Sequence, residues 1–504
     1  MRPYCGMTTT QNTSPIRAPE LSGAIAWLNL PAPLSLKALR GKVVLLDFWT
    51  YGCINCIHIL PDLKKLEARF PSELVVIGVH AAKFDNEKAT ENIRQIIRRY
   101  DITHPVANDA EFRIWRGYTV RAWPSRVIID PAGYIVGAAS GEGNYEGFEQ
   151  AIEAVIRVFD ERGQIDRTPL TVRLEGDGVA DTPFKFPGKV LATADQLFIS
   201  DSNHHQIVVT GHDGREFERI GAGRAGRANG GFAEAEFHKP QGLALVDGQL
   251  WVADTENHLL RRIDFDSRQV TTEAGTGEQC AWKEEGGKAT SVALNPPWDL
   301  AVHGPILFVA MAGAHQIWMM DVARGILWPY AGSGQEARID GTIEEAAFAQ
   351  PSGLAVTNAD MFVADAESNI VRAIALPPVN TVRTLAGGDL FEFGDVDGRG
   401  DVVRLQHPLG VAFLPNGRVA IADTYNHKIK TLDPRTGQVN TLAGTGRPGH
   451  NDGPGRKAQF YEPGGISVSG NTIFVADTNN HCIRVVDARS GLTTTLNVRR
   501  TLAP

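Results

Sequence analysis

The sequence predicts two domains, an α/β sandwich followed by an all-β propeller of six blades. Two observations lead to this prediction. Apolar strands alternate with helical patterns as far as residue 165, and beyond it the helical patterns end and one β-rich unit recurs six times. The 52 Gly and 28 Pro among 504 residues follow no collagen-like period, so they predict the frequent tight turns of a β-rich protein. We expect a disordered N-terminus over residues 1–19, the α/β domain over 20–165 and the propeller over 166–504.

Each element of the α/β domain is predicted by its pattern of apolar residues. Residues 42–49 (KVVLLDFW) form an almost continuous apolar run, which is typical of a strand buried on both faces. Between residues 86 and 100, Ile93, Ile96 and Ile97 recur at helical spacing and predict an amphipathic helix. By the same criteria, further strands are expected at residues 74–79, 126–130 and 134–138, and further helices at residues 56–70 and 148–159.

The second domain is predicted by its internal repeat. Each unit has an apolar strand, Ala-Asp-Thr, Asn-His, a second strand and a Gly turn, and the next unit opens with Pro-x-Gly. A lone unit of about four strands cannot bury both faces, so the units are expected to ring a central channel. Residues 170–174 are a candidate closing strand that would pair with residues 493–498. The equivalent positions of the six units are Asp201, Asp254, Met311, Asp365, Asp423 and Asp477.

The Asp and Asn-His residues of the repeat could be metal ligands or catalytic groups. Because nearly the same set recurs at matched positions, we interpret it as satisfying backbone groups of turns and hydrogen bonds between strands. The third unit departs most from the pattern, since Met311 and Ala312 replace Asp-Thr. The Trp residues around it either line a binding face or fill the core of that blade; they are Trp282, Trp298, Trp318 and Trp328.

Charge and composition indicate which classes of binding partner and which cellular compartment to expect. Residues 1–165 contain 19 Lys and Arg against 18 Asp and Glu, whereas the remaining chain contains 31 against 40, a net charge of −9. An acidic propeller disfavours nucleic acid as a partner. No apolar run reaches the ~18 residues of a membrane span, and the N-terminus, whether it starts at Met1 or Met7, has no apolar core of a secretory signal. Five cysteines are too few for a disulfide framework, so a reducing, cytoplasmic location is expected.

The pair Cys53 and Cys56 is the candidate redox site. The two residues follow the strand at 42–49 and open a helix, where free N–H groups and the helix dipole stabilise a thiolate. Cys53 is expected to be exposed and to attack a disulfide, and Cys56, one turn further in, would resolve the mixed disulfide. No cofactor besides this dithiol is expected. Two alternatives are half of a zinc site, which needs two further ligands, and an unreactive buried pair.

The residues around this pair resemble the active-site segment of thioredoxins. Asp47-Phe48-Trp49 precedes the two cysteines, Pro61 follows them, and Trp123-Pro124-Ser125 precedes the strand at 126–130. The resemblance extends over nearly all of residues 20–160 and implies a thioredoxin-like fold. It also implies a role for each site residue: Cys53 is the nucleophile, Cys56 the resolving thiol, Asp47 a buried proton acceptor, Pro124 the cis-proline of the substrate groove, and Trp49 a neighbour of the dithiol.

Both domains together resemble one family. The run at residues 50–56 is similar to thioredoxin-like domains that are fused to NHL-repeat propellers, and the Asp-Thr-x-Asn-His signature resembles NHL repeats. The chain resembles a bacterial-type member of the NHL repeat-containing protein 2 family. We therefore expect a thiol–disulfide oxidoreductase that exchanges its dithiol with a protein client or redox partner. The propeller, which presents rigid loops, would be the partner-binding platform, and the chain is expected to be a monomer. The alternative is a scaffold without catalysis, and an RNA-binding propeller is disfavoured by the acidic charge.

Overall fold

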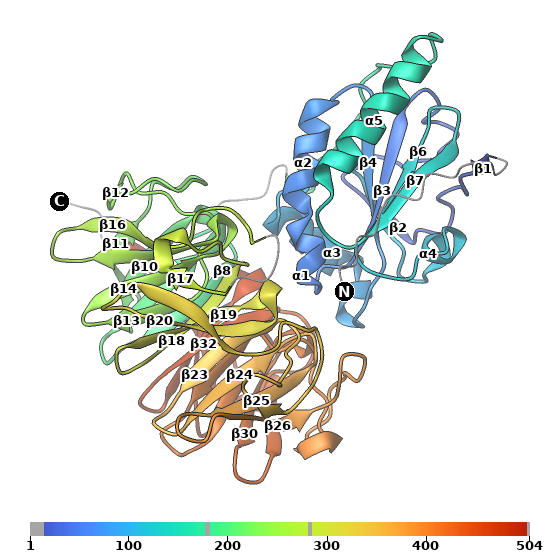
Figure 1. The fold of residues 1–504 in the computed structure, drawn as a ribbon. Helices are drawn as coiled ribbons and strands as arrows, with labels where there is room; N and C mark the ends of the chain where they lie inside the picture. The colour runs from blue at the N-terminus through green and yellow to red at the C-terminus, as the bar shows by residue number, and fades with distance from the viewer. Residues whose placement is uncertain (1–14, 177–181, 281–284, 501–504) are drawn as a thin grey trace. The chain divides into compact units, whose positions relative to one another are not determined.

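The computed structural model describes residues 15–176, 182–280 and 285–500, and the chain divides into two compact units, residues 1–180 and 181–504 (Figure 1). Residues 1–14 lie outside the described part, and with them most of the segment expected to be disordered. The rest of that segment differs from the expectation. Strand β1 (Ile16–Arg17) pairs antiparallel with β7 (Tyr134–Ser140), and the amide of Ala18 donates to the carbonyl of Gly133.

The first unit is an α/β sandwich around one mixed sheet with the strand order β1-β7-β6-β3-β4-β5-β2. Strands β3, β4 and β5 are parallel to one another, and β6 is antiparallel to β3. The remaining strands are β2 (Ala26–Leu28), β3 (Val43–Trp49), β4 (Leu74–His80), β5 (Val106–Asn108) and β6 (Ser125–Ile129). The helices within residues 15–176 are α1 (Ile54–His58), α2 (Leu60–Arg69), the 3₁₀ turn η1 (Asn86–Lys88), α3 (Thr90–Arg99), α4 (Arg113–Gly117) and α5 (Tyr145–Asp160).

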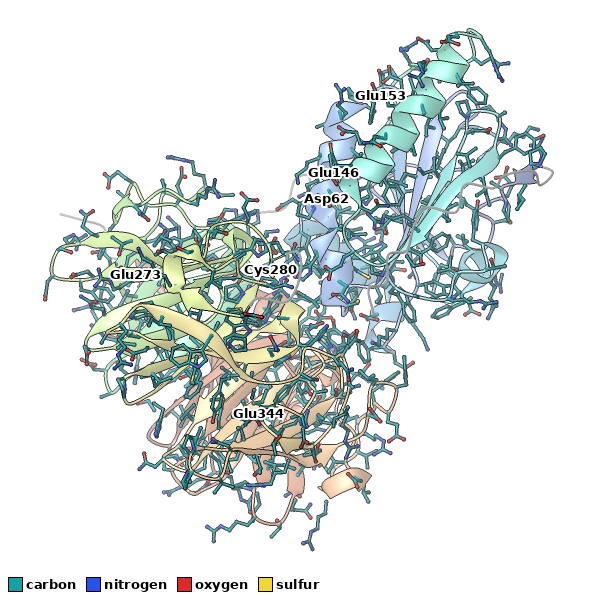
Figure 2. All side chains as sticks on the ribbon, viewed as in Figure 1. Asp62, Glu146, Glu153, Glu273, Cys280 and Glu344 are labelled. Atoms are coloured by element: carbon teal, nitrogen blue, oxygen red, sulfur yellow. The ribbon has the colours of Figure 1, made fainter. Side chains whose placement is uncertain are left out.

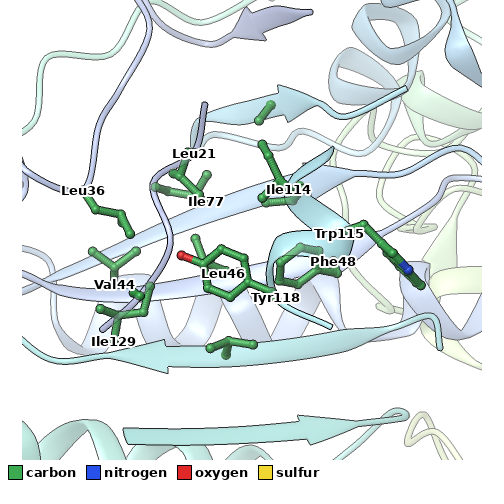
Figure 3. Close-up of a cluster of buried hydrophobic side chains, with 14 of the residues drawn as sticks. Leu21, Leu36, Val44, Leu46, Phe48, Ile77, Ile114, Trp115, Tyr118 and Ile129 are labelled. Carbon is green, nitrogen blue, oxygen red and sulfur yellow. The ribbon is translucent and has the colours of Figure 1, made fainter. Parts of the chain in front are cut away.

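Strand β3 is buried along its whole length and sends alternate side chains to the two faces of the sheet. Val44, Leu46 and Phe48 join a buried cluster on one face, which Figure 3 shows together with Ile114 of α4. By alternation, Asp47 and Trp49 point to the opposite face. Helices α2 and α5 lie over the sheet (Figure 1). On α5 the exposed residues include Glu146 and Glu153, which are labelled in Figure 2, while Phe148 and Ile152 are buried.

The helix expected at residues 56–70 is interrupted. Helix α1 ends at His58 and α2 begins at Leu60, with Ile59 between them and Pro61 in the first turn of α2. Proline has no amide hydrogen to donate back along the helix, so a helix readily restarts there. The dithiol therefore opens a short helix that leads directly into a longer one.

The first unit extends further along the chain than expected. The amide of Asp166 donates to the carbonyl of Gly41, and that of Arg173 to the carbonyl of Asn29. The ammonium of Lys42 donates to the carbonyl of Thr168 at 2.7 Å. These bonds tie residues 166–175 to the first unit. The proposed closing strand at 170–174 was therefore wrong, because these residues form no strand and the amide of Arg173 bonds to the first unit.

The second unit is an all-β propeller of six blades in the part of the chain that the structure describes. The innermost strands of neighbouring blades contact each other and form the central channel. The first three blades contain, in order, β8 (Pro187–Ala192), β9 (Gln196–Asp201), β10 (Gln206–Gly211) and β11 (Arg215–Ile220); β12 (Gly230–Gly231), β13 (Leu243–Val246), β14 (Gln249–Asp254), β15 (Leu259–Asp264) and β16 (Gln269–Ala274); β17 (Gly287–Lys288), β18 (Pro297–His303), β19 (Ile306–Met311), β20 (Gln316–Asp321) and β21 (Ile326–Ala331).

The last three blades repeat this arrangement. They contain β22 (Gly341–Thr342), β23 (Pro351–Val356), β24 (Asp360–Asp365), β25 (Ile370–Ala375) and β26 (Thr381–Gly387); β27 (Gly398–Arg399), β28 (Gly410–Phe413), β29 (Val419–Asp423), β30 (Lys428–Asp433) and β31 (Gln438–Ala443); β32 (Pro463–Ser469), β33 (Thr472–Asp477), β34 (Cys482–Asp487) and β35 (Thr493–Thr495). The ring is closed by β36 (Arg499–Arg500), which follows the last blade and pairs parallel with β11 of the first blade.

The repeated residues are structural, as the sequence predicted. One carboxylate oxygen of Asp254 accepts the amide of His238, and the other accepts the side chains of Asn257 and Arg261. The Thr of the motif reaches the next blade, as in the bond from Thr478 to the carbonyl of Pro187 at 2.9 Å. The unit therefore satisfies turn and inter-blade backbone groups. In the third blade Trp298 and Trp318 are buried, the latter within a hydrophobic cluster, whereas Trp282 lies outside the described residues.

The Gly of each Pro-x-Gly is required by the close approach of the next blade. A Cβ at Gly242 would lie 2.5 Å from the Cα of Asp299, and one at Gly465 would lie 2.5 Å from the Cα of Lys189. These atoms belong to backbone that cannot move independently. A Gly242→Ala substitution is therefore expected to destabilise the propeller by about 1–3 kcal/mol.

This prediction is tested by the urea midpoint of the full chain. The matched control is Gly231→Ala, where the nearest atom is a carboxylate oxygen of Glu234 at the end of a flexible side chain. The control is expected to change the free energy of unfolding by less than about 0.5 kcal/mol. Equal midpoints for the two variants would contradict the steric explanation.

An ion pair crosses the central channel. The ammonium of Lys189 donates to a carboxylate oxygen of Asp299 at 3.1 Å and to the carbonyls of Ser352 and Leu409 at 2.7 Å each. The same carboxylate oxygen accepts the amide of Leu354. One lysine of the first blade thus bonds to the third, fourth and fifth blades. A cavity of about 420 Å³ lined mainly by apolar residues adjoins this pair.

Candidate active site

The dithiol lies where strand β3 passes into helix α1. Cys53 is the N-cap of α1 with extended backbone (φ −99°, ψ 115°), its amide donates to the carbonyl of Thr50, and the amide of Cys56 donates to the carbonyl of Cys53. Both cysteines are free thiols. One helical turn therefore carries both sulfurs, as the spacing predicted.

Both thiols are buried. Cys56 is fully buried, and Cys53 is only 6% exposed, so the expectation of an exposed Cys53 was wrong. The connection before Cys53 is also held in the interior, since Glu87 accepts the amide of Gly52 and the hydroxyl of Thr50. Burial raises the pKa of the Cys56 thiol well above its usual range, and its hydrogen bond with Cys53 raises that pKa further.

Asp47 is a buried carboxyl group near Cys56. It lies on β3, and neither carboxylate oxygen has a hydrogen-bond partner among the described residues. Burial raises the pKa of Asp47 to about 7, against the opposing effects of Arg126 and His104. The Asp47 carboxylate in turn raises the pKa of Cys56. A carboxyl group that titrates near neutral pH beside a buried thiol can exchange a proton with it.

Arg126 is a buried charge that the sequence analysis did not single out. It stands opposite Asp47 in the β3–β6 register and is 1% exposed. Its guanidinium donates to the carbonyls of Gly141 and Gly143 and lies 4.3 Å from the centre of the Phe148 ring. Burial lowers the pKa of Arg126, and the Asp47 carboxylate raises it. An arginine inside a predicted buried strand was the available signal, because such a residue usually has a charged neighbour.

Trp49 is fully buried at the end of β3. Its ring meets the ring of His80 edge to face at 5.0 Å, and His80 in turn stacks on Tyr51 at 5.4 Å. Burial lowers the pKa of His80 to about 3, so this imidazole is neutral at physiological pH. The observed contacts place Trp49 in an aromatic cluster beneath the connection to Cys53.

Pro124 lies directly before the first residue of the neighbouring strand β6. The Trp123–Pro124 peptide bond is cis. Ser125 pairs with Phe48 in the antiparallel register, so Pro124 lies beside Trp49. The indole of Trp123 donates to the carbonyl of Ala81 at 2.9 Å and packs against Trp115. The strand register thus places Pro124 near the end of β3, where the connection to the dithiol begins.

The further ligands that a zinc site at the dithiol would need are not found together in the described part of the chain. His58 pairs with Glu142 at 2.7 Å, and Cys280 and Cys482 belong to the second unit. Among the residues with described positions, no three His, Cys, Asp or Glu side chains gather closely enough to hold a metal ion.

Of the helices with described positions, none combines the length and apolarity needed to cross a bilayer.

Known families match both units. A family model described as thioredoxin-like matches residues 41–135, and one described as NHL repeat matches residues 237–263, 405–432 and 460–486. The thiol-disulfide oxidoreductase YkuV of Bacillus subtilis is similar to a shorter part of this chain. It is 24% identical over 139 residues, which cover 27% of this chain and 93% of the Bacillus protein.

Two relatives match nearly the whole chain. The protein SUPPRESSOR OF QUENCHING 1, chloroplastic, of Arabidopsis thaliana is 44% identical over 94% of this chain, which spans 47% of the plant protein's length. NHL repeat-containing protein 2 of Gallus gallus is 41% identical over 96% of this chain and 72% of the chicken protein. That the chain is a bacterial-type member stays a prediction. With a thioredoxin-like domain followed by an NHL-type propeller of six blades, the chain belongs to the NHL repeat-containing protein 2 family.

Proposed function

We propose that this protein is a thiol–disulfide oxidoreductase that exchanges disulfides with a protein client. The observation that carries the proposal is the dithiol itself. Cys53 is the N-cap of α1, Cys56 lies one turn further, and the Asp47 carboxyl group with a pKa of about 7 lies near Cys56. The names of similar thioredoxin-like proteins, such as the Bacillus oxidoreductase, support the same chemistry.

The proposed reaction has two exchange steps. The Cys53 thiolate attacks one sulfur of a client disulfide, the client's other sulfur leaves as a thiolate, and a mixed disulfide with Cys53 forms. Asp47 then accepts the proton of Cys56, and the Cys56 thiolate attacks the Cys53 sulfur. The client leaves as a dithiol and this chain is left with a Cys53–Cys56 disulfide. A dithiol reductant must then restore the two thiols. Pro124 would shape the groove that binds the client, and Trp49 would support the dithiol from the interior.

Insulin reduction by dithiothreitol tests the proposal. The wild-type chain is expected to accelerate it, Cys53→Ser to return the rate to that of dithiothreitol alone, and Cys56→Ser to accumulate a mixed disulfide visible by mass. The matched control is Cys482→Ser, since this cysteine lies in the propeller and burial raises the pKa of its thiol. A wild-type rate equal to that of dithiothreitol alone would contradict the proposal.

A scaffold without catalysis is the second candidate. Two observations favour it, the 6% exposure of Cys53 and the raised pKa of Cys56, because an attacking thiol must be accessible and ionised. In that case insulin reduction and mixed-disulfide trapping would both fail while the chain remains folded.

The propeller is proposed as the platform for the partner. A propeller presents rigid loops on its faces, and this unit carries the acidic excess of the chain. A protein partner therefore fits better than a nucleic acid. The small number of cysteines suits a reducing compartment such as the cytoplasm, although the name of the Arabidopsis relative places that protein in the chloroplast. We propose that the chain acts as a monomer.

A further inference from the structure

Glu87 is a buried carboxylate that holds the connection leading to the dithiol. It lies in η1, is 0% exposed, and accepts four hydrogen bonds. One oxygen accepts the amide of Gly52 at 2.6 Å. The other accepts the hydroxyl of Thr50 at 2.6 Å and the amides of Lys83 and Phe84 at 2.7 and 2.8 Å. Both oxygens are thus used, and each holds a different residue of the connection.

The connection is short, and Glu87 fixes it at two of its three residues. Thr50, Tyr51 and Gly52 separate the last residue of β3 from Cys53. The amide of Cys53 donates to the carbonyl of Thr50, so a displacement of Thr50 changes the start of the turn that carries Cys53. Cys56 stays anchored by its burial and by its place inside α1. A change in the connection therefore moves the two sulfurs relative to each other.

Gly52 and Glu87 fit each other sterically. A Cβ at Gly52 would lie 2.6 Å from the Oε1 atom of Glu87 and 3.0 Å from the ring of Phe84. The amide of Gly52 can approach the carboxylate only because this position lacks a side chain. The residue before the nucleophilic cysteine is thus adapted to an acceptor that lies 35 residues away in the sequence.

We propose that Glu87 is a positioning residue that holds the Thr50–Gly52 connection and thereby keeps Cys53 within reach of Cys56. The position of the two sulfurs does not depend on the proposed function; only the effect of Glu87 on exchange with a client rests on it. The exchange of the dithiol with glutathione tests it directly: oxidised glutathione takes two electrons and two protons from Cys53 and Cys56, giving a disulfide and two reduced glutathione molecules.

Glu87→Gln is the first test. A glutamine side chain keeps one oxygen, so its NH₂ group must face either the amide of Gly52 or the donors around Thr50. The effective concentration of one sulfur at the other is expected to fall at least tenfold. The equilibrium constant for Cys53–Cys56 disulfide formation with glutathione should fall by the same factor, which corresponds to a potential about 30 mV less negative. The mixed disulfide with glutathione should resolve more slowly by a similar factor.

Asp109→Asn is the matched control. Asp109 is also a fully buried carboxylate that accepts backbone amides, those of Arg113, Ile114 and Trp115, but none of its bonds reaches the connection before Cys53. This variant is expected to lower the thermal midpoint and to leave the glutathione equilibrium within twofold of wild type. The comparison separates loss of stability from loss of positioning.

Thr50→Val is the second test, and it replaces the first if Glu87→Gln does not fold. It removes one donor to Glu87 and leaves the amide of Gly52 bonded. Its glutathione equilibrium is expected to shift two- to fivefold in the same direction. An equilibrium and a resolution rate within twofold of wild type, in Glu87→Gln or in a folded Thr50→Val, would overturn the inference. Failure of the wild-type chain to reduce insulin would count against the proposed function alone, whereas a wild-type dithiol that never forms a disulfide with glutathione would overturn both.

Discussion

Asp47→Asn is expected to stabilise the first unit at pH 8 by about 2–4 kcal/mol. Burial raises the pKa of Asp47 in the folded chain to about 7, whereas its usual value is 3.8. Between these two values the folded chain keeps a proton that the unfolded chain has lost, so the free energy of unfolding falls as pH rises. The full penalty is reached above pH 7, and an amide side chain never incurs it.

Hydrogen exchange in peptides from β3 measures this effect in the intact chain, because those amides report on the unfolding of their own unit. The gain should be largest at pH 8 and should fall to less than about 1 kcal/mol near pH 4, because this pH lies close to the usual pKa of 3.8, below which both states keep the proton. Asp62→Asn is the control, since that carboxylate on α2 is partly exposed and pairs with Lys65. A gain of equal size at both pH values would show that ionisation of Asp47 is not its cause.

Lys189→Met is expected to destabilise the propeller by about 3–5 kcal/mol. Both members of the Lys189–Asp299 pair are largely buried, with side chains 6% and 13% exposed. Without the ammonium group, the carboxylate keeps its negative charge in a site with little water, and the carbonyls of Ser352 and Leu409 lose a donor. The cost is therefore that of an uncompensated buried charge rather than that of one lost hydrogen bond.

A double-mutant cycle checks this explanation. Adding Asp299→Asn to Lys189→Met removes the remaining charge and should recover at least half of the lost free energy of unfolding, as measured by urea denaturation of the full chain. Arg383→Met is the control, because it breaks a partly exposed pair with Asp360 in the same unit and should cost less than about 1 kcal/mol. A double variant no more stable than Lys189→Met would refute the charge argument.

The regular elements were predictable because their signals are local. The apolar run that forms β3 and the spacing of the isoleucines in α3 lie within one element each. The number of blades could be predicted because the motif recurs at nearly constant spacing. The short strands β2 and β5 and the helix α4 were missed, since three to five residues are too few to display a period.

The closing strand was not predictable in this way. Pairing of β36 with β11 joins residues at opposite ends of the second unit, and no local pattern distinguishes that partner from residues 170–174. Within the candidate segment, the amide of Arg173 instead donates to the carbonyl of Asn29, which precedes it by more than one hundred residues. Just before the segment, Asp166 and Thr168 bond to Gly41 and Lys42.

The sequence by itself determined which residues could carry redox chemistry, because Cys53 and Cys56 are neighbours along the chain and Asp47, Trp49 and Pro124 stand at fixed offsets within a resembling segment. Only the tertiary structure decided how those residues are held. Glu87 reaches Gly52, Arg126 faces Asp47, and Lys189 meets Asp299, in each case across a separation of tens of residues or more. The physical reason is that a buried charge is stabilised by whichever donors or counter-charges surround it in space, and these are set by the packing of strands rather than by their order along the chain.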